Sequence, residues 1–79
     1  MAVITDAAAG WSAPVTVAAT ELWQVRLGTV YLTTGPGIDP DDGLELTQGF
    51  AVQFYAGVEV RYRKGAGVAP LLVREVVAP

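Results

Sequence analysis

The sequence predicts an all-β protein, a small antiparallel β-sandwich or barrel of six or seven short strands with a flexible N-terminal arm. Apolar and polar residues alternate with the period of two that is typical of half-buried strands. Turns that contain Gly recur between the alternating stretches, and no stretch keeps a helical period for more than one turn. We expect residues 1–12 to form the arm and residues 13–79 to form a single β-domain.

The clearest alternation lies between Gly43 and Lys64 and predicts three consecutive antiparallel strands. Three-residue turns at 47–49 and 55–57 each end in Gly, where this hairpin type requires a left-handed residue. A two-residue second turn would place Phe54 opposite Glu59, so we prefer the three-residue turn. The predicted register then puts the following apolar pairs on one face: Leu46 with Phe50, Leu44 with Val52, Phe54 with Val58, Val52 with Val60, and Phe50 with Tyr62.

A first strand and then a hairpin are expected before this meander. Residues 15–17 follow Pro14, a residue that is tolerated at the start or edge of a strand. Residues 21–34 predict a hairpin with a two-residue turn at Gly28 and Thr29, because Gly in the first position favours a type II′ turn. The alternative is one long strand with a bulge at Gly28.

The last strand begins at Leu71 and is apolar on both sides apart from Arg74 and Glu75. This pattern is typical of a strand that is covered on both faces or inserted between neighbours. It ends at Pro79.

Length and composition predict that the chain associates with partners. With 79 residues, 52% apolar and 16% charged, it is too apolar for a disordered chain, yet a single core of this size rarely supplies more than about 3–5 kcal/mol. The chain has no Cys and no His, so it lacks disulfides and the commonest metal ligand. We therefore expect neighbouring subunits to complete the apolar surface.

The N-terminal arm and the last strand carry the candidate interface residues. Residues 7–10 interrupt any strand that Val3 begins. Trp11 either covers the edge of its own core or docks on a neighbour, since Trp is enriched at interface hot spots. The candidates for the interface are Trp11, Ile4, Leu72 and Val76.

Charge and N-terminal composition argue against two classes of partner. A formal net charge of −3 does not fit a nucleic-acid footprint, and Arg61, Arg63 and Lys64 are interpreted as a solvated rim. Residues 1–11 have neither a basic region nor a long apolar run, so we expect no signal peptide and no transmembrane helix. We expect a chain that is made in the cytoplasm and used without secretion.

Catalysis is not expected. The chain has no Cys to act as a nucleophile, and its single Ser12 has no His to act as a base. The acidic residues occupy turns and solvent-facing strand positions such as Glu45 and Glu59. No glycine-rich phosphate loop occurs, and we expect no cofactor.

Two weaker binding hypotheses remain open. Asp39, Asp41 and Asp42 surround a turn and could wrap a calcium ion, although the spacing departs from an EF-hand loop and Asp is also an ordinary turn residue. Tyr31 and Tyr55 occupy positions outside the expected core and could stack on sugars or single strands, or be surface tyrosines.

Three elements occur in the order found in small all-β structural proteins of tailed bacteriophages and phage-like particles. They are Leu22-Trp23-Gln24, the turn at 46–49 (LTQG), and residues 56–63 (AGVEVRYR). The chain resembles these proteins over residues 20 to 64. The resemblance implies a capsid decoration (cement) protein on the virion surface, often a trimer, that bridges major capsid protein subunits or binds another virion protein. A tail or connector component, or a free-standing carbohydrate- or cation-binding module, is the alternative.

Overall fold

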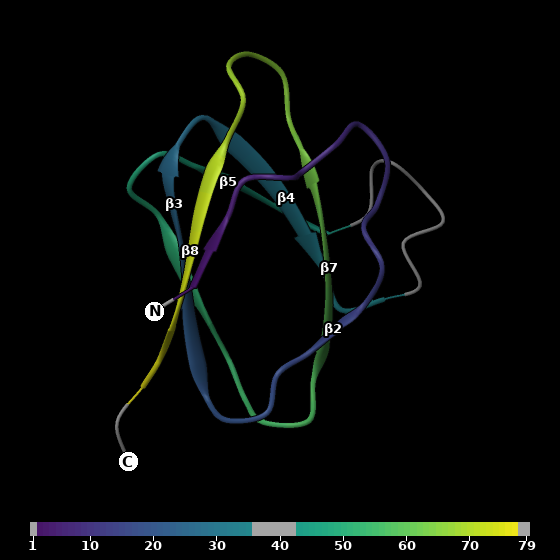
Figure 1. Cartoon of the computed structure of the whole chain (residues 1–79), viewed down its shortest axis with the longest axis vertical. Coiled ribbons are helices and arrows are strands. Elements are labelled where there is room, and N and C mark those ends of the chain that lie inside the picture. Colours follow the sequence, from purple (N-terminus) through teal and green to yellow (C-terminus); the bar gives the residue numbers. More distant parts are fainter. Residues whose placement is uncertain (1, 36–42, 78–79) are drawn as a thin grey trace.

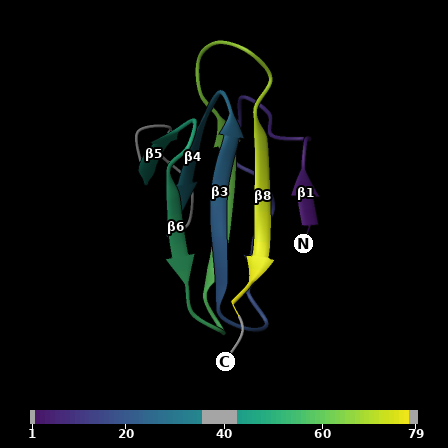
Figure 2. The same cartoon turned by 90° about the vertical axis from the view of Figure 1, so that its left-hand side faces the viewer.

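The computed structural model describes residues 2–35 and 43–77, which form two four-stranded antiparallel sheets (Figure 1). One sheet has the strand order β1-β8-β3-β6 and is seen face-on in Figure 2, and the other has the order β2-β7-β4-β5. The strands are β1 (Ala2–Ile4), β2 (Val15–Thr16), β3 (Glu21–Leu27), β4 (Thr29–Thr33), β5 (Leu44–Thr47), β6 (Ala51–Phe54), β7 (Glu59–Lys64) and β8 (Leu71–Val76).

The described residues thus contain eight strands, and the expectation of six or seven was wrong. The architecture is a two-sheet sandwich and not a single closed barrel. The additional strand is β1, which lies in the segment expected to be a flexible arm. Three residues without alternation give little sequence signal, so only the contact with β8 identifies this strand.

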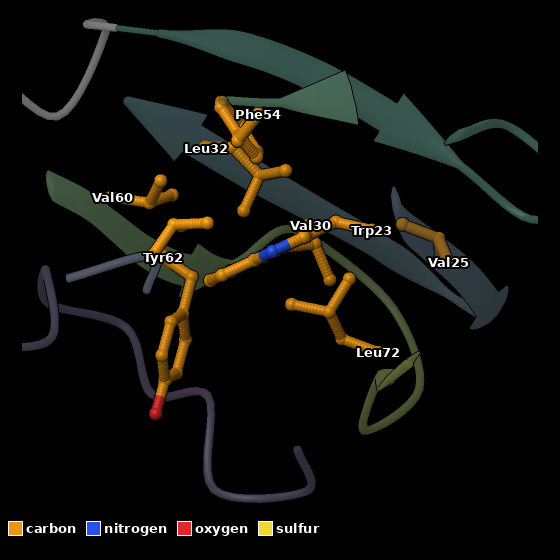
Figure 3. Close-up of a cluster of buried hydrophobic side chains, with 9 residues drawn as sticks. Trp23, Val25, Val30, Leu32, Phe54, Val60, Tyr62 and Leu72 are labelled. Carbon is orange, nitrogen blue, oxygen red and sulfur yellow. The ribbon is translucent and has the colours of Figure 1, made fainter. Parts of the chain in front are cut away.

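The core lies between the two sheets and is built from alternate residues of the long strands. Inward-facing side chains from both sheets interdigitate, as expected for a sandwich (Figure 3). Trp23 is fully buried, and its ring meets Phe54 edge to face with a centroid distance of 5.4 Å. The remaining members of the core are Val17, Val25, Val30, Leu32, Val60, Tyr62 and Leu72.

The strands between Gly43 and Lys64 do not form the expected meander. β5 pairs with β4, β6 pairs with β3, and β7 pairs with β4 and β2, so the chain alternates between the two sheets. The predicted register, from the Leu44–Val52 pair to the Phe50–Tyr62 pair, is therefore wrong. Alternation indicates which face of a strand is buried but not which strand lies beside it.

The turns themselves form where the sequence predicts them. Gly49 and Gly57 have φ angles of 93° and 91°, the left-handed conformation expected at the last turn position. The amide of Phe50 donates to the carbonyl of Thr47 at 3.0 Å. Both turns join strands of different sheets. The same turn residues can therefore close a hairpin within one sheet or carry the chain from one sheet to the other.

A hairpin at Gly28 was also expected and is absent from the structure. β3 and β4 belong to different sheets, so the chain from Glu21 to Thr33 crosses the sandwich at Gly28, closer to the long interrupted strand that was the alternative. Gly28 has a φ of 76°, and a Cβ there would lie 3.2 Å from the carbonyl oxygen of Val68. The corner therefore requires the conformation and the small size of Gly.

The last strand lies between two neighbours, as its sequence indicated. β8 is hydrogen-bonded to β1 on one side and to β3 on the other. After β1 the N-terminal segment crosses from this sheet toward β2 (Figure 1). On the way, the carbonyl of Ala8 accepts from the Lys64 amide at 2.8 Å and the Ser12 amide donates to the carbonyl of Tyr62 at 2.9 Å. Residues 2–12 are therefore hydrogen-bonded to both sheets.

Candidate interaction surface

A partly buried ion pair joins β3 and β8. Glu21 accepts two hydrogen bonds from Arg74, at 2.9 Å from Nε and 3.1 Å from Nη2. Glu21 Oε1 also accepts from the indole nitrogen of Trp23 at 3.0 Å, and the guanidinium lies 4.9 Å from the centroid of that ring. This pair was not predicted, although Glu21 points to the same side of its strand as Trp23, and Arg74 to the same side as Leu72.

A second polar contact connects the N-terminal segment to the core. The hydroxyl of Tyr62 points out of the core cluster (Figure 3) and donates to Asp6 Oδ1 at 2.8 Å. Burial raises the pKa of Tyr62, and the hydrogen bond to Asp6 and its negative charge raise this pKa further. The tyrosine therefore keeps the proton that it donates to Asp6. This hydrogen bond holds the segment that follows β1 against the core.

The outer face of the second sheet carries a row of aromatic and charged side chains. The hydroxyl of Tyr31 donates to Glu45 Oε2 at 2.8 Å. The guanidinium carbon of Arg63 lies 4.1 Å from the Tyr31 ring centroid and 5.2 Å from that of Trp11. Such cation–π contacts stabilise an ordered surface. Trp11 is half-buried beside Arg63 of the same chain, and it does not belong to the core cluster.

Arg61 and Arg63 of β7 are half-buried and have contacts within the chain, so for these two residues the interpretation as a solvated rim was wrong, whereas Lys64 is exposed. Nη1 of Arg61 donates to the carbonyl oxygen of Ser12 at 3.3 Å. The hydroxyl of Ser12 accepts from the Tyr62 amide at 3.0 Å. Arg61 and Ser12 therefore hold the N-terminal segment against the second sheet.

Large apolar side chains are exposed at several places on the described residues. Phe50 and Tyr55, which flank β6 of the first sheet, are 63% and 67% exposed. On the outer face of the first sheet Val3 is exposed and lies opposite Val73 of β8. The other exposed large apolar residues lie on both sheets and in the segments after β7 and β8, and they are Leu22, Leu27, Leu44, Val68, Val76 and Val77.

The four candidate interface residues occupy different environments. Leu72 is 1% exposed and belongs to the core, so its side chain is not part of the surface that we propose below. Ile4 is half-buried and packs against the core from β1. Val76 is exposed at the end of β8, whereas Trp11 is half-buried beside Arg63.

The candidate cation ligands Asp39, Asp41 and Asp42 lie outside the described residues. Among the residues that the structure does describe, no three acidic side chains gather to hold a metal ion. Tyr55 lies exposed in the turn between β6 and β7, away from the row that contains Tyr31. The two candidate stacking tyrosines therefore do not form one platform.

The fold defines a class of protein, a small two-sheet antiparallel sandwich with several exposed apolar side chains. Comparison with protein-family models, curated proteins and solved structures found no match. In residues 2–35 and 43–77, no helix is long and apolar enough to cross a membrane.

Proposed function

We propose that this chain is a non-enzymatic structural subunit that works by binding neighbouring subunits in a larger assembly. The observation that carries the proposal is the exposure of two aromatic side chains, Phe50 and Tyr55, at the two ends of β6, which is an edge strand among the described residues. A free edge presents unpaired backbone amides and carbonyls, and exposed apolar surface beside it gains free energy when it is covered. Together they support a binding role for this edge.

The size of the core supports the same role. Nine of the described residues make up its buried cluster, and the chain has no Cys and therefore no disulfide to brace it. A single core in a domain of this size contributes only about 3–5 kcal/mol of net stability. Contacts between subunits add to this stability by mass action, so a chain of this kind is more stable when it is part of an assembly.

The specific form that we propose is a virion decoration protein on a capsid surface, where it bridges and stabilises major capsid protein subunits or binds another virion protein. The resemblance over residues 20 to 64 is the ground for this assignment and for a trimeric arrangement. A tail or connector component would use the same apolar edges. The row formed by Glu45, Tyr31, Arg63 and Trp11 is an ordered polar surface that a capsid subunit could contact beside the apolar one.

The decisive experiment is to determine where the protein resides. Phage-like particles are purified from cells that produce the chain, and its copy number relative to the shell protein is measured by quantitative mass spectrometry. We expect a fixed ratio that survives repeated sedimentation. Recovery of the chain only in the unsedimented fraction would overturn the virion assignment.

A free-standing binding module predicts a different result. Such a module would keep its melting temperature over about a hundredfold dilution and would melt higher when calcium or a carbohydrate is added. A structural subunit is expected to melt lower on dilution and to show no shift with either ligand.

A further inference from the structure

β8 has the sequence of a strand that pairs readily with other chains. Its six residues are apolar apart from Arg74 and Glu75, whose charges cancel, and they include no Pro and no Gly. Segments of six or seven residues with high β-propensity, low net charge and no Pro are typical sites of pairing between chains. An open edge along β8 would therefore be a template for a strand from another molecule.

β3 lies along one edge of β8 and pairs with every second residue of it. The amide of Val25 on β3 donates to the carbonyl of Phe50 at 3.0 Å, so the backbone groups of Val25 are directed away from β8. Because these directions alternate along a strand, those of Gln24 are directed to β8, where Gln24 lies opposite Val73. The backbone groups of Val73 and Glu75 are therefore the ones that face β3.

β1 covers the other edge of β8 (Figure 2). By the same alternation, the backbone groups of Leu72 and Arg74 are directed to this side, opposite Ile4 and Ala2. Among the described residues, β1 is the only strand that pairs with this edge. If β1 left, the amides and carbonyls of Leu72 and Arg74 would form an open edge on an apolar strand.

The contacts of β1 are separate from those of the segment that follows it. β1 has three residues, of which two are exposed, and Val3 is 52% exposed. The following segment is bonded to β7, where Asp6 accepts from the Tyr62 hydroxyl and the carbonyl of Ala8 accepts from the Lys64 amide. Detachment of β1 from β8 leaves these bonds in place. Local opening of so short a strand costs less free energy than global unfolding.

We propose that β1 is a protective strand that keeps the edge of β8 closed and is released while the rest of the sandwich stays folded. Release uncovers the backbone groups of Leu72 and Arg74, and β8 then pairs with an extended strand of another chain. The ligand that fits this edge is seen in β1 itself, an uncharged antiparallel strand of small and apolar residues. The inference goes beyond the proposed virion role and does not depend on it.

Amide hydrogen exchange in the parent chain tests the release without any variant. Opening of β1 removes the partners of the Leu72 and Arg74 amides and leaves those of Val73 and Glu75 bonded to β3. The protection factors of the first two amides, measured by NMR, should therefore be at least about tenfold lower than those of the second two. Equal protection of the four amides would show that β1 and the sandwich open together.

Two proline variants test whether β1 restrains association. Ala2→Pro removes an amide that is directed to β8, whereas the amide of Val3 is directed away from β8, so Val3→Pro is the matched control at the next exposed position. In light scattering, Ala2→Pro should associate at least about tenfold faster than the parent, and Val3→Pro should stay within about threefold of it. Circular dichroism checks that both variants are folded.

A lysine at the end of β8 tests whether this strand is where the chains pair. Val76 is exposed, and Val76→Lys added to Ala2→Pro should return the association rate to within about threefold of the parent, because Lys on a sheet edge opposes pairing. Val68→Lys, in the exposed segment after β7, should leave the rate of Ala2→Pro unchanged. Each lysine changes the formal net charge from −3 to −2, so total charge does not distinguish the two variants.

Three results would each overturn the protective role of β1. They are equal protection of the four β8 amides, an Ala2→Pro variant that associates no faster than Val3→Pro, and a Val76→Lys variant with no more effect than Val68→Lys. The exchange measurement uses the parent chain, so it decides the question even if a variant does not fold. None of these results changes the copy number of the chain in particles, so the protective role and the virion role fail separately.

Discussion

Among the individual residues, Glu21 connects two neighbouring side chains. The residue is 7% exposed, and its carboxylate accepts hydrogen bonds from both Arg74 and Trp23. A buried carboxylate is stable only when its partners replace the lost water. Removing one member of such a pair leaves the other member buried without its counter-charge, and this costs more than the pair itself contributes.

Replacement of Glu21 by Gln should therefore destabilise the fold. The side chain keeps its shape, but one oxygen that accepts from Arg74 becomes an amide donor, so we expect the free energy of unfolding to fall by about 2 kcal/mol. Urea denaturation followed by Trp fluorescence measures this change. The control is Glu59→Gln at an exposed position, with an expected loss below about 0.5 kcal/mol. Equal losses in the two variants would contradict a structural role for the pair.

Tyr62 should make the stability of the protein fall at alkaline pH. Burial raises its pKa above the ordinary value of 10.0, so the folded state retains this proton after the unfolded chain has lost it. The contribution to stability is full below pH 10.0 and is lost as the pH rises through the folded-state pKa. Tyr62→Phe removes the ionisation and should decline less steeply above this pH.

The measurement for Tyr62 is the free energy of unfolding of the parent and of Tyr62→Phe, at intervals from about pH 8 to about pH 11. The difference between the two should be constant at the lower values and should shrink at the higher ones, because only the parent loses this contribution. A difference independent of pH would show that the pKa of Tyr62 is the same in the folded and unfolded states.

Among the elements, β1 tests whether the N-terminal segment contributes to the stability of the fold. Ile4 packs against the core, whereas Val3 on the same strand points outward and is exposed. The two neighbouring residues therefore report on opposite faces of β1.

Ile4→Ala should cost about 2 kcal/mol of unfolding free energy, because it removes half-buried methylene groups, while Val3→Ala should cost less than about 0.5 kcal/mol. Chemical denaturation at low protein concentration isolates folding from association. If both variants unfold like the parent, β1 contributes nothing to the stability of the single chain, and the segment would act only in assembly.

For the whole molecule, the topology has consequences for folding kinetics. Six strand pairings occur in the described residues, and only β4–β5 joins strands that are consecutive in the sequence. Every other pairing must close a longer loop before its contacts form.

We expect refolding in milliseconds to seconds, the range of β-sandwiches dominated by non-local pairing. Trp23 is fully buried, so stopped-flow fluorescence can follow the process. Refolding in microseconds would contradict the topology, since only local hairpins form that fast.

Much of the architecture could be predicted from the residues. Alternation identified the inward faces of β3, β4 and β7, and the Gly residues at 49 and 57 marked turns that the structure contains. The nearly continuous apolar character of β8 indicated a strand between two neighbours. The candidate surface was harder to predict from the sequence, because Leu72 has the sequence pattern of an interface residue and the environment of a core residue.

The sequence by itself determined the all-β class, the positions of most strands and turns, and the inward side of each long strand, because these depend on local periodicity and on backbone freedom at Gly. The tertiary structure decided which strands pair, where the chain crosses between sheets, and that Glu21 meets Arg74. Strand partners are selected by the fit of whole faces that lie far apart in the sequence, and that fit exists only once the two sheets are packed together.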